Sequence, residues 1–186
     1  VWAADKGEMV VDGVKFVGNV AGAGGGGLYS AVKVKATGCT FNGNKATLVG
    51  KAFGGGIRLD GVGTISDCVF TNNVSALYGG GLYVHNKAVA TVTGTTFTGN
   101  KAANGGAVLS FGASTKIANT TMVANIATVM GGAVATNAPA GGTMDLRNCT
   151  IVGNSAPKLA GVEFNGVFRL FNTVIAGAKG GGADCG

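Results

Sequence analysis

Short apolar segments alternate with polar corners along the chain, and the alternation returns at a regular interval. One pattern, an apolar residue followed by two spacers and Asn, occurs at residues 16–19, 41–44, 70–73, 97–100, 122–125 and 151–154. Successive asparagines are 25 to 29 residues apart, and a degenerate copy without Asn occupies residues 174–177. A repeat of this length that persists along a chain is typical of a solenoid.

A glycine pair followed by an aliphatic residue accompanies every copy of the first motif. It reads GGGL at 25–28, GGGI at 54–57, GGGL at 79–82, GGAV at 105–108 and 131–134, and the weaker LAGV at 159–162. Between the motifs, period-two alternation predicts three short strands per repeat and no helix. The sequence therefore predicts an all-β fold, a parallel β-helix of about six to seven coils.

The two motifs also indicate which side chains face the core and which form corners. The apolar column expected to stack inside contains Phe16, Phe41, Phe70, Phe97, Met122, Ile151 and Val174. Asn tolerates left-handed backbone and bonds to neighbouring main chain, so we expect the asparagines to align as a ladder at one corner. The glycine pairs mark the next corner, where the backbone needs dihedrals or close approach that favour Gly.

The repeat limits define the domain organisation. We expect an N-terminal cap over residues 1–12, a single β-helix domain over 13–178 and a glycine-rich C-terminal tail over 179–186. The glycines at 180–182 give the last coil little cover.

The paired motifs resemble those of the chlamydial polymorphic outer membrane proteins, in which FxxN and GGA followed by Ile, Leu or Val are repeated. The resemblance covers about residues 14–177. It implies a right-handed helix, secretion or display on the cell surface, and an adhesive or structural role. The chain departs from the family pattern where Met122 and Ile151 replace Phe.

Composition and charge exclude several classes. Gly supplies 36 residues without a three-residue period and Pro only 2, which excludes collagen; a mean hydropathy of +0.37 excludes disorder. The net charge is +6, but the basic residues are scattered, so we expect no nucleic-acid partner. No apolar run reaches the roughly 18–20 residues of a transmembrane segment.

The cysteines leave two alternatives open. Cys39 and Cys68 share an inward column in adjacent coils, where they form either stacked buried thiols or a strained disulfide. Cys185 lies past the last coil, where it is able to fold back toward Cys149. No Cys/His pair has ligand spacing, so we expect neither a metal nor another cofactor.

Parity places one group of chemically distinctive residues on a single outer face. These candidates for a partner-binding face are Tyr29, Arg58, Asp60, Tyr83 and His85. Aromatic faces and an Arg fork suit sugars or acidic polymers.

An enzymatic site is not expected. Ser110 would join Asp60 and His85 as a nucleophilic triad only if its coil slid by one residue; in the preferred register it faces the core. The acidic residues fall mostly in separate coils or at the ends, which does not fit the paired carboxylates of glycoside hydrolysis.

A second outer face carries threonine and valine beside the inward phenylalanines. The threonines predicted on this face are Thr40, Thr71, Thr96, Thr98, Thr121, Thr150 and Thr173. Their regular spacing resembles that of ice-binding β-solenoids, although β-branched residues also favour strands for conformational reasons.

The sequence thus predicts a non-catalytic, secreted or cell-surface rod with a structural or adhesive role. Its expected partners are glycans, other surface proteins or copies of itself. The alternatives are ice binding through the threonine face, and carbohydrate binding or polysaccharide processing.

Overall fold

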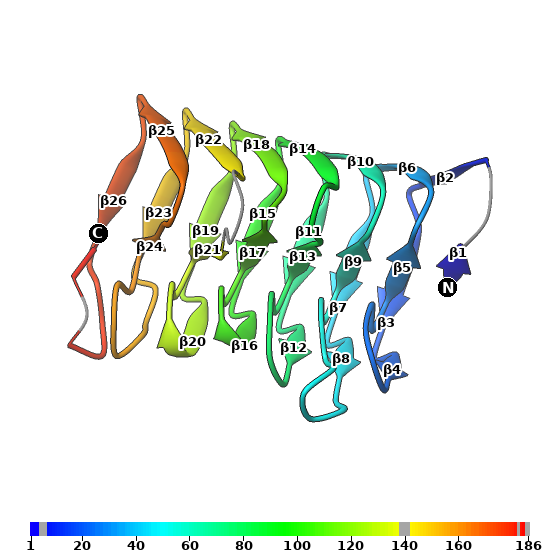
Figure 1. The fold of residues 1–186 in the computed structure, drawn as a ribbon, viewed down its shortest axis with the longest axis horizontal. Helices are drawn as coiled ribbons and strands as arrows, with labels where there is room; N and C mark the ends of the chain where they lie inside the picture. Colours follow the sequence, from blue (N-terminus) through cyan, green and yellow to red (C-terminus); the bar gives the residue numbers. More distant parts are fainter. Residues whose placement is uncertain (4–6, 138–141, 182, 185–186) are drawn as a thin grey trace.

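Parallel strands wind the chain into a solenoid. A computed structural model describes residues 1–3, 7–137, 142–181 and 183–184. These residues form 26 strands and no helix, and the strands stack into four sheets that run along the rod (Figure 1).

The first two sheets each take one strand from every coil. Sheet A consists of β1 (Trp2–Ala3), β5 (Leu28–Ser30), β9 (Ile57–Leu59), β13 (Leu82–Val84), β17 (Val108–Phe111), β21 (Val134–Asn137) and β24 (Val162–Glu163). Sheet B consists of β2 (Glu8–Asp12), β6 (Lys33–Thr37), β10 (Val62–Ser66), β14 (Val89–Thr93), β18 (Ser114–Ala118), β22 (Thr143–Arg147) and β25 (Val167–Phe171).

The third sheet carries the phenylalanine column and the fourth follows the asparagine corner. Sheet C consists of β3 (Lys15–Val17), β7 (Thr40–Asn42), β11 (Val69–Thr71), β15 (Thr96–Thr98), β19 (Thr121–Val123), β23 (Thr150–Val152) and β26 (Val174–Ala176). Sheet D consists of β4 (Val20–Ala21), β8 (Lys45–Ala46), β12 (Val74–Ser75), β16 (Lys101–Asn104) and β20 (Ile126–Met130).

The predicted phenylalanine column forms the centre of the core. Phe41, Phe70 and Phe97 are fully buried. Their rings stack nearly parallel, with centroids 4.6 Å apart between each neighbouring pair. That distance matches the spacing of adjacent strands, so each ring packs on its equivalent in the next coil.

The asparagines form the predicted ladder, buried from Asn44 to Asn154. Asn100 is representative: its Nδ2 donates to the Oδ1 of Asn125 and to the carbonyl oxygen of Phe70, both at 2.9 Å. Its Oδ1 accepts from the main-chain N and the Nδ2 of Asn73, at 3.0 and 2.9 Å. Each amide from Asn44 to Asn125 therefore joins its own corner to both neighbouring coils.

The glycine pairs form the predicted second corner. Gly79 has a left-handed φ of +61°, and a Cβ on the next glycine, Gly80, would overlap the carbonyl oxygen of Gly106 in the following coil. At these glycine pairs side chains are excluded because the coils approach through their backbones.

Sheet D is an addition to the three predicted strands per coil. Its strands begin directly after the asparagines, where the main-chain N–H of Lys45 donates to the carbonyl of Asn19, and that of Val74 to Asn44. The ladder thus keeps neighbouring coils in register past the corner. Three of these strands, β4, β8 and β12, have only two residues and show no period-two alternation, so the sequence pattern did not reveal this sheet.

The last coil is displaced by one residue from the predicted alignment. Ile151 pairs with Ile175, and Thr150 pairs with Val174, so Ile175 and not Val174 continues the inward column. Thr173 then faces inward, where its hydroxyl accepts from the main-chain N of Cys149 at 3.3 Å. Its placement on the threonine face was wrong, because this coil lacks the asparagine that marks the register elsewhere.

Described residues near both ends of the chain form hydrogen bonds with the coils of the solenoid. In the predicted cap, β1 and β2 are the outermost strands of sheets A and B. In the predicted tail, the carbonyls of Ala183 and Asp184 accept from the main-chain N of Ala160 and Val162. Residues 183–184 therefore lie beside β24 and cover more of the last coil than the glycine-rich sequence suggested.

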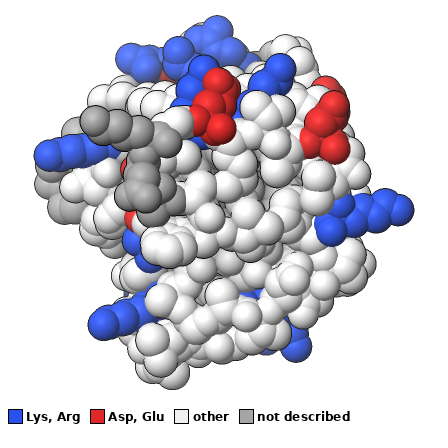
Figure 2. All heavy atoms as spheres, turned by 90° about the vertical axis from the view of Figure 1, so that its right-hand side faces the viewer, with Lys and Arg blue, Asp and Glu red and all other residues white. Residues whose placement is uncertain are grey.

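The charges are dispersed, as the sequence indicated. Viewed at the N-terminal end of the rod, Lys, Arg, Asp and Glu lie mostly around the rim, and the described surface between them is uncharged (Figure 2). Among the described residues, no helix has the length and apolar character needed to span a membrane.

The phenylalanine stack gives a direct test of the core. Phe70→Ala should lower the free energy of unfolding by about 3–5 kcal/mol, because the flanking rings hold the cavity open. Val69→Ala changes the exposed neighbour on the same strand and should cost less than about 1 kcal/mol. Urea denaturation measures both, and equal losses would contradict the assignment.

The ladder gives a second test. Asn100→Ala removes four hydrogen bonds and leaves the buried main-chain N of Asn73 without its partner, while Asn73 Nδ2 and the Phe70 carbonyl each keep one. The unpaired donor costs about 1–3 kcal/mol and each further lost bond about 0.5–1.5 kcal/mol, so the loss should reach about 3 kcal/mol. Asn42→Ala, at an exposed position of β7, is the matched control and should be nearly neutral.

Candidate binding face

The structure brings the five predicted face residues together on the outer side of sheet A. Arg58 of β9 pairs in register with Tyr29 of β5 on one side and Tyr83 of β13 on the other. Asp60 and His85 follow two residues further along, at the ends of the same two strands. The period-two alternation of a strand explains why residues so far apart in sequence meet here.

Arg58 and Asp60 form a closed polar network with Tyr29. The guanidinium donates from Nε and Nη2 to the two carboxylate oxygens of Asp60, at 2.9 and 2.7 Å. The Tyr29 hydroxyl donates to Asp60 Oδ2 at 3.0 Å, and burial together with this bond raises the Tyr29 pKa. Asp60 therefore already occupies the guanidinium donors of Arg58 that we expected to bind an acidic polymer.

Tyr83 points outward from the sheet but is not exposed to solvent, which corrects the expectation of an open face. Only 2% of its surface is accessible, because Phe53 and Tyr78 stack against it with ring centroids 5.0 and 6.1 Å away. Its hydroxyl lies 3.0 Å from His85 Nδ1, and burial raises its pKa.

Phe53 and Tyr78 are the residues that the sequence analysis missed. Each stands immediately before a glycine pair, and the two pair with each other as an isolated bridge between coils. The signal was present as an aromatic residue in the same motif position of two consecutive repeats. It was overlooked because these positions lie outside the predicted strands.

The contacts join into one aromatic strip along the first coils. We call this surface the aromatic strip. It comprises Trp2, Tyr29, Phe53, Arg58, Tyr78, Tyr83, His85 and Phe111. Trp2 stacks on Tyr29 at 6.5 Å, and the Arg58 guanidinium lies 5.1 Å from the ring centroids of Tyr29 and of Phe53. His85 stacks on Phe111 at 6.2 Å, which extends the strip into the fourth coil.

The residues of the hypothetical triad do not assemble. Ser110 is 3% exposed and faces the core, where its hydroxyl pairs with that of Thr115 at 2.9 Å. Asp60 is held by Arg58 and Tyr29. The predicted inward orientation of Ser110 is thus confirmed.

Six of the seven predicted threonines lie on the outer side of sheet C. Thr40, Thr96, Thr121 and Thr150 occupy the column before the phenylalanines, interrupted by Val69. Thr71 and Thr98 form the column after them. Thr173 belongs to the inward side, so the array is shorter than predicted.

The described cysteines are buried free thiols. Cys39, Cys68 and Cys149 face inward, and the main-chain N of Cys39 lies 3.3 Å from the Cys68 Sγ. Burial raises the pKa of Cys68 to about 12 and also raises that of Cys149. Of the two alternatives, stacked thiols are confirmed; Cys185 lies outside the described residues.

Metal ions in proteins are commonly held by three or more acidic, His or Cys side chains. Within the described ranges, no three such groups lie close enough together to hold an ion.

Comparison with family models gives a match over most of the chain. A family model described as a right-handed beta helix region matches residues 27–185, most of the chain. No curated protein and no solved structure matches the chain.

The thiol pKa shifts lead to a test of reactivity. In a Cys185→Ser variant at about pH 8, the three described thiols should resist a disulfide exchange reagent, because all three are buried and burial also disfavours the thiolates of Cys68 and Cys149. Unfolding in guanidinium should release all three. Release of only one would indicate a Cys39–Cys68 disulfide and overturn the assignment.

Proposed function

The chain belongs to the right-handed β-helix family, and from that premise we propose that it is a non-catalytic structural and adhesive rod. The aromatic strip carries the proposal. Its exposed and half-buried rings lie on a frame that the core and the ladder hold stiff, and a preorganised surface loses little entropy on binding.

The strip has the chemistry of an adhesive surface. Trp2 is 72% exposed, and Phe53, His85 and Phe111 remain partly accessible. Aromatic faces stack on the apolar faces of sugar rings, and Trp, Tyr and Arg dominate protein interfaces. Because Asp60 neutralises Arg58, the strip suits neutral glycans better than acidic ones. Glycans are therefore the first partners to test, ahead of surface proteins or a second copy of the chain.

Secretion or surface display is part of the same proposal. The resemblance of the FxxN and GGA motifs to polymorphic outer membrane proteins supports it. The buried, unreactive thiols are compatible with an oxidising environment, because the fold does not depend on their pairing.

The positions of the acidic groups support a non-catalytic role. Asp60 is engaged by Arg58 and Tyr29, and Asp145 by Arg169 at 3.2 Å on the outer side of sheet B. Glycoside hydrolysis needs two carboxylates facing one bond, and these two lie on different sheets.

Ice binding is the second candidate function. Thr96, Thr121 and Thr150 pair directly in three successive coils, which gives hydroxyl and methyl groups a regular repeat. Val69, and Val174 in place of a threonine, interrupt that repeat, so we rank ice below glycans.

The strip predicts how binding will respond to mutation. The purified chain should sediment with at least one insoluble neutral polysaccharide, such as cellulose, chitin or xylan. The double variant Trp2→Ala/His85→Ala should weaken this binding about tenfold, because stacking contacts contribute about 0.5–1.5 kcal/mol each. Phe171→Ala removes an exposed ring on sheet B, away from the strip, and should leave binding unchanged.

Other outcomes distinguish the alternatives. Release of sugar products from the same polysaccharides would contradict the non-catalytic assignment. Thermal hysteresis that disappears in Thr96→Tyr/Thr121→Tyr, without polysaccharide binding, would transfer the function to the threonine face. Equal weakening by Phe171→Ala would show that the strip is not the contact surface.

A further inference from the structure

Along the rod, the outward side chains of sheet A change from large rings that cover the face to small residues that leave a hollow. Its outward column runs from Tyr83 through Leu109 to Ala135. Beside it, the position before the glycine pair changes from Tyr78 in the third coil to Met130 in the fifth. Where the rings end, a pocket of about 350 Å³ opens.

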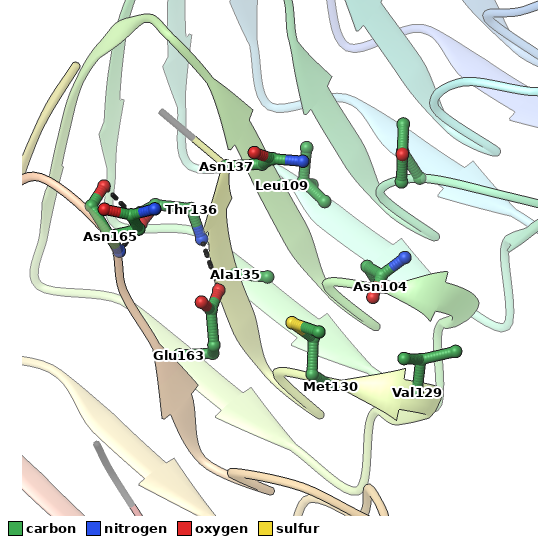
Figure 3. A pocket seen from close by; sticks show the side chains of 10 residues that line it. Asn104, Leu109, Val129, Met130, Ala135, Thr136, Asn137, Glu163 and Asn165 are labelled. Atoms are coloured by element: carbon green, nitrogen blue, oxygen red, sulfur yellow. Dashed lines mark hydrogen bonds between the residues drawn. The ribbon is translucent and has the colours of Figure 1, made fainter. Parts of the chain in front are cut away.

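Two kinds of wall enclose this pocket. Figure 3 shows Glu163 of β24 on one side of Ala135, and Met130 and Val129 of β20 on the other. The side of Glu163 also carries Asn165, whose main-chain N–H donates to the Thr136 hydroxyl. The opening thus combines an apolar wall with a polar, acidic one.

Glu163 has a half-buried carboxylate whose negative charge is offset by few neighbouring groups. The main-chain N of Thr136 donates to its Oε2 at a long 3.3 Å. No Lys or Arg of the described residues lies within salt-bridge distance of it. Burial raises its pKa, and the Thr136 bond offsets only part of that effect. A carboxylate in such a place gains from a ligand that brings a positive charge.

The charged groups on the neighbouring elements do not fill this role. Lys158 is exposed, and its backbone pairs with Met130 on the far side of the pocket. The Asp184 carboxylate, beside β24, accepts from the main-chain N of Ala178 at 2.8 Å. Tyr78 is the other titratable residue among those that line the pocket.

We propose that this pocket binds the protonated amine of an amino sugar unit, with Glu163 as the anionic partner. A charge-assisted hydrogen bond joins the ammonium to the carboxylate. The amides of Asn104, Asn137 and Asn165 line the same space and offer donors and acceptors to ring hydroxyls. Val129 and Met130 receive the apolar face of the ring.

Size and charge both narrow the ligand class. The volume lies at the small end of ligand pockets, which suits one monosaccharide unit. The described lining contains no basic residue, so a uronic acid or a phosphate would face Glu163 without compensation.

This inference goes beyond the adhesive function and does not depend on it. The strip and the pocket share sheet A but use separate side chains except for Tyr78, at their boundary. Loss of one binding activity is therefore distinguishable from loss of the other.

The test titrates the whole chain with glucosamine, glucose and choline, followed by the methyl NMR signals of Ala135 and Met130. At about pH 6.5, glucosamine should bind about tenfold or more tightly than glucose, as expected when a hydrogen bond to a charged group is added. Glu163→Gln should remove this preference. Glu8→Gln changes an exposed glutamate at the other end of the rod and should preserve it.

A second variant keeps the test independent of Glu163. Ala135→Tyr places in the fifth coil the residue that the third coil has at the same position, so it should fill the pocket and abolish binding of every sugar. Equal binding of glucose and glucosamine would overturn the role of charge. Choline binding without glucosamine binding would overturn the amino sugar assignment, and no binding at all would overturn the site.

The pH dependence follows from the direction of the Glu163 pKa. Because the pKa is raised above 4.5, the carboxyl takes up its proton at a higher pH than an ordinary glutamate does. Amines stay protonated throughout this range. Glucosamine affinity should therefore fall on acidification through the raised pKa, while the weaker binding of glucose stays constant.

Discussion

The hydrogen bonds of the asparagine ladder fix the register on which the rest of the rod depends. From Asn44 to Asn125, one buried amide in each coil bonds to the previous and the following corner, so none of these coils is able to slide without breaking bonds in both neighbours. The phenylalanine stack has no such directionality, because packed rings tolerate small shifts at little cost. Apolar burial thus supplies most of the stability, and the amides determine which residues lie side by side.

That register determines the surface as well as the core. Once the coils are aligned, every outward position becomes a column along the rod, and the content of a column decides whether its face is filled or open. On sheet A, rings fill the face as far as Phe111, and Ala135 leaves it hollow. The strip and the pocket are therefore two results of one construction, produced by side-chain size at equivalent positions.

Most of the fold could be predicted because its signals recur in every repeat. The inward phenylalanines, the buried asparagines and the inward Ser110 all lie where the motif phase puts them. The prediction failed where a motif was missing or fell outside a strand. Without an asparagine, the last coil was misaligned, and Thr173 was placed on the wrong side. Tyr83 was expected to face solvent because parity gives the direction of a side chain, but not whether a residue such as Phe53 covers it.

The spacing of adjacent coils also restricts the distances between features on one face to fixed steps. Features on one face are separated by whole coils, each about 4.8 Å along the rod. A duplicated or deleted coil that carries its own Asn and glycine pair would preserve the contacts at both joins, because coils contact only their neighbours. The strip and the pocket overlap in the third and fourth coils, so such a change on the C-terminal side of Asn165 would alter the length of the rod by a fixed step and leave both intact. The number of repeats therefore determines the length of the rod in steps of one coil.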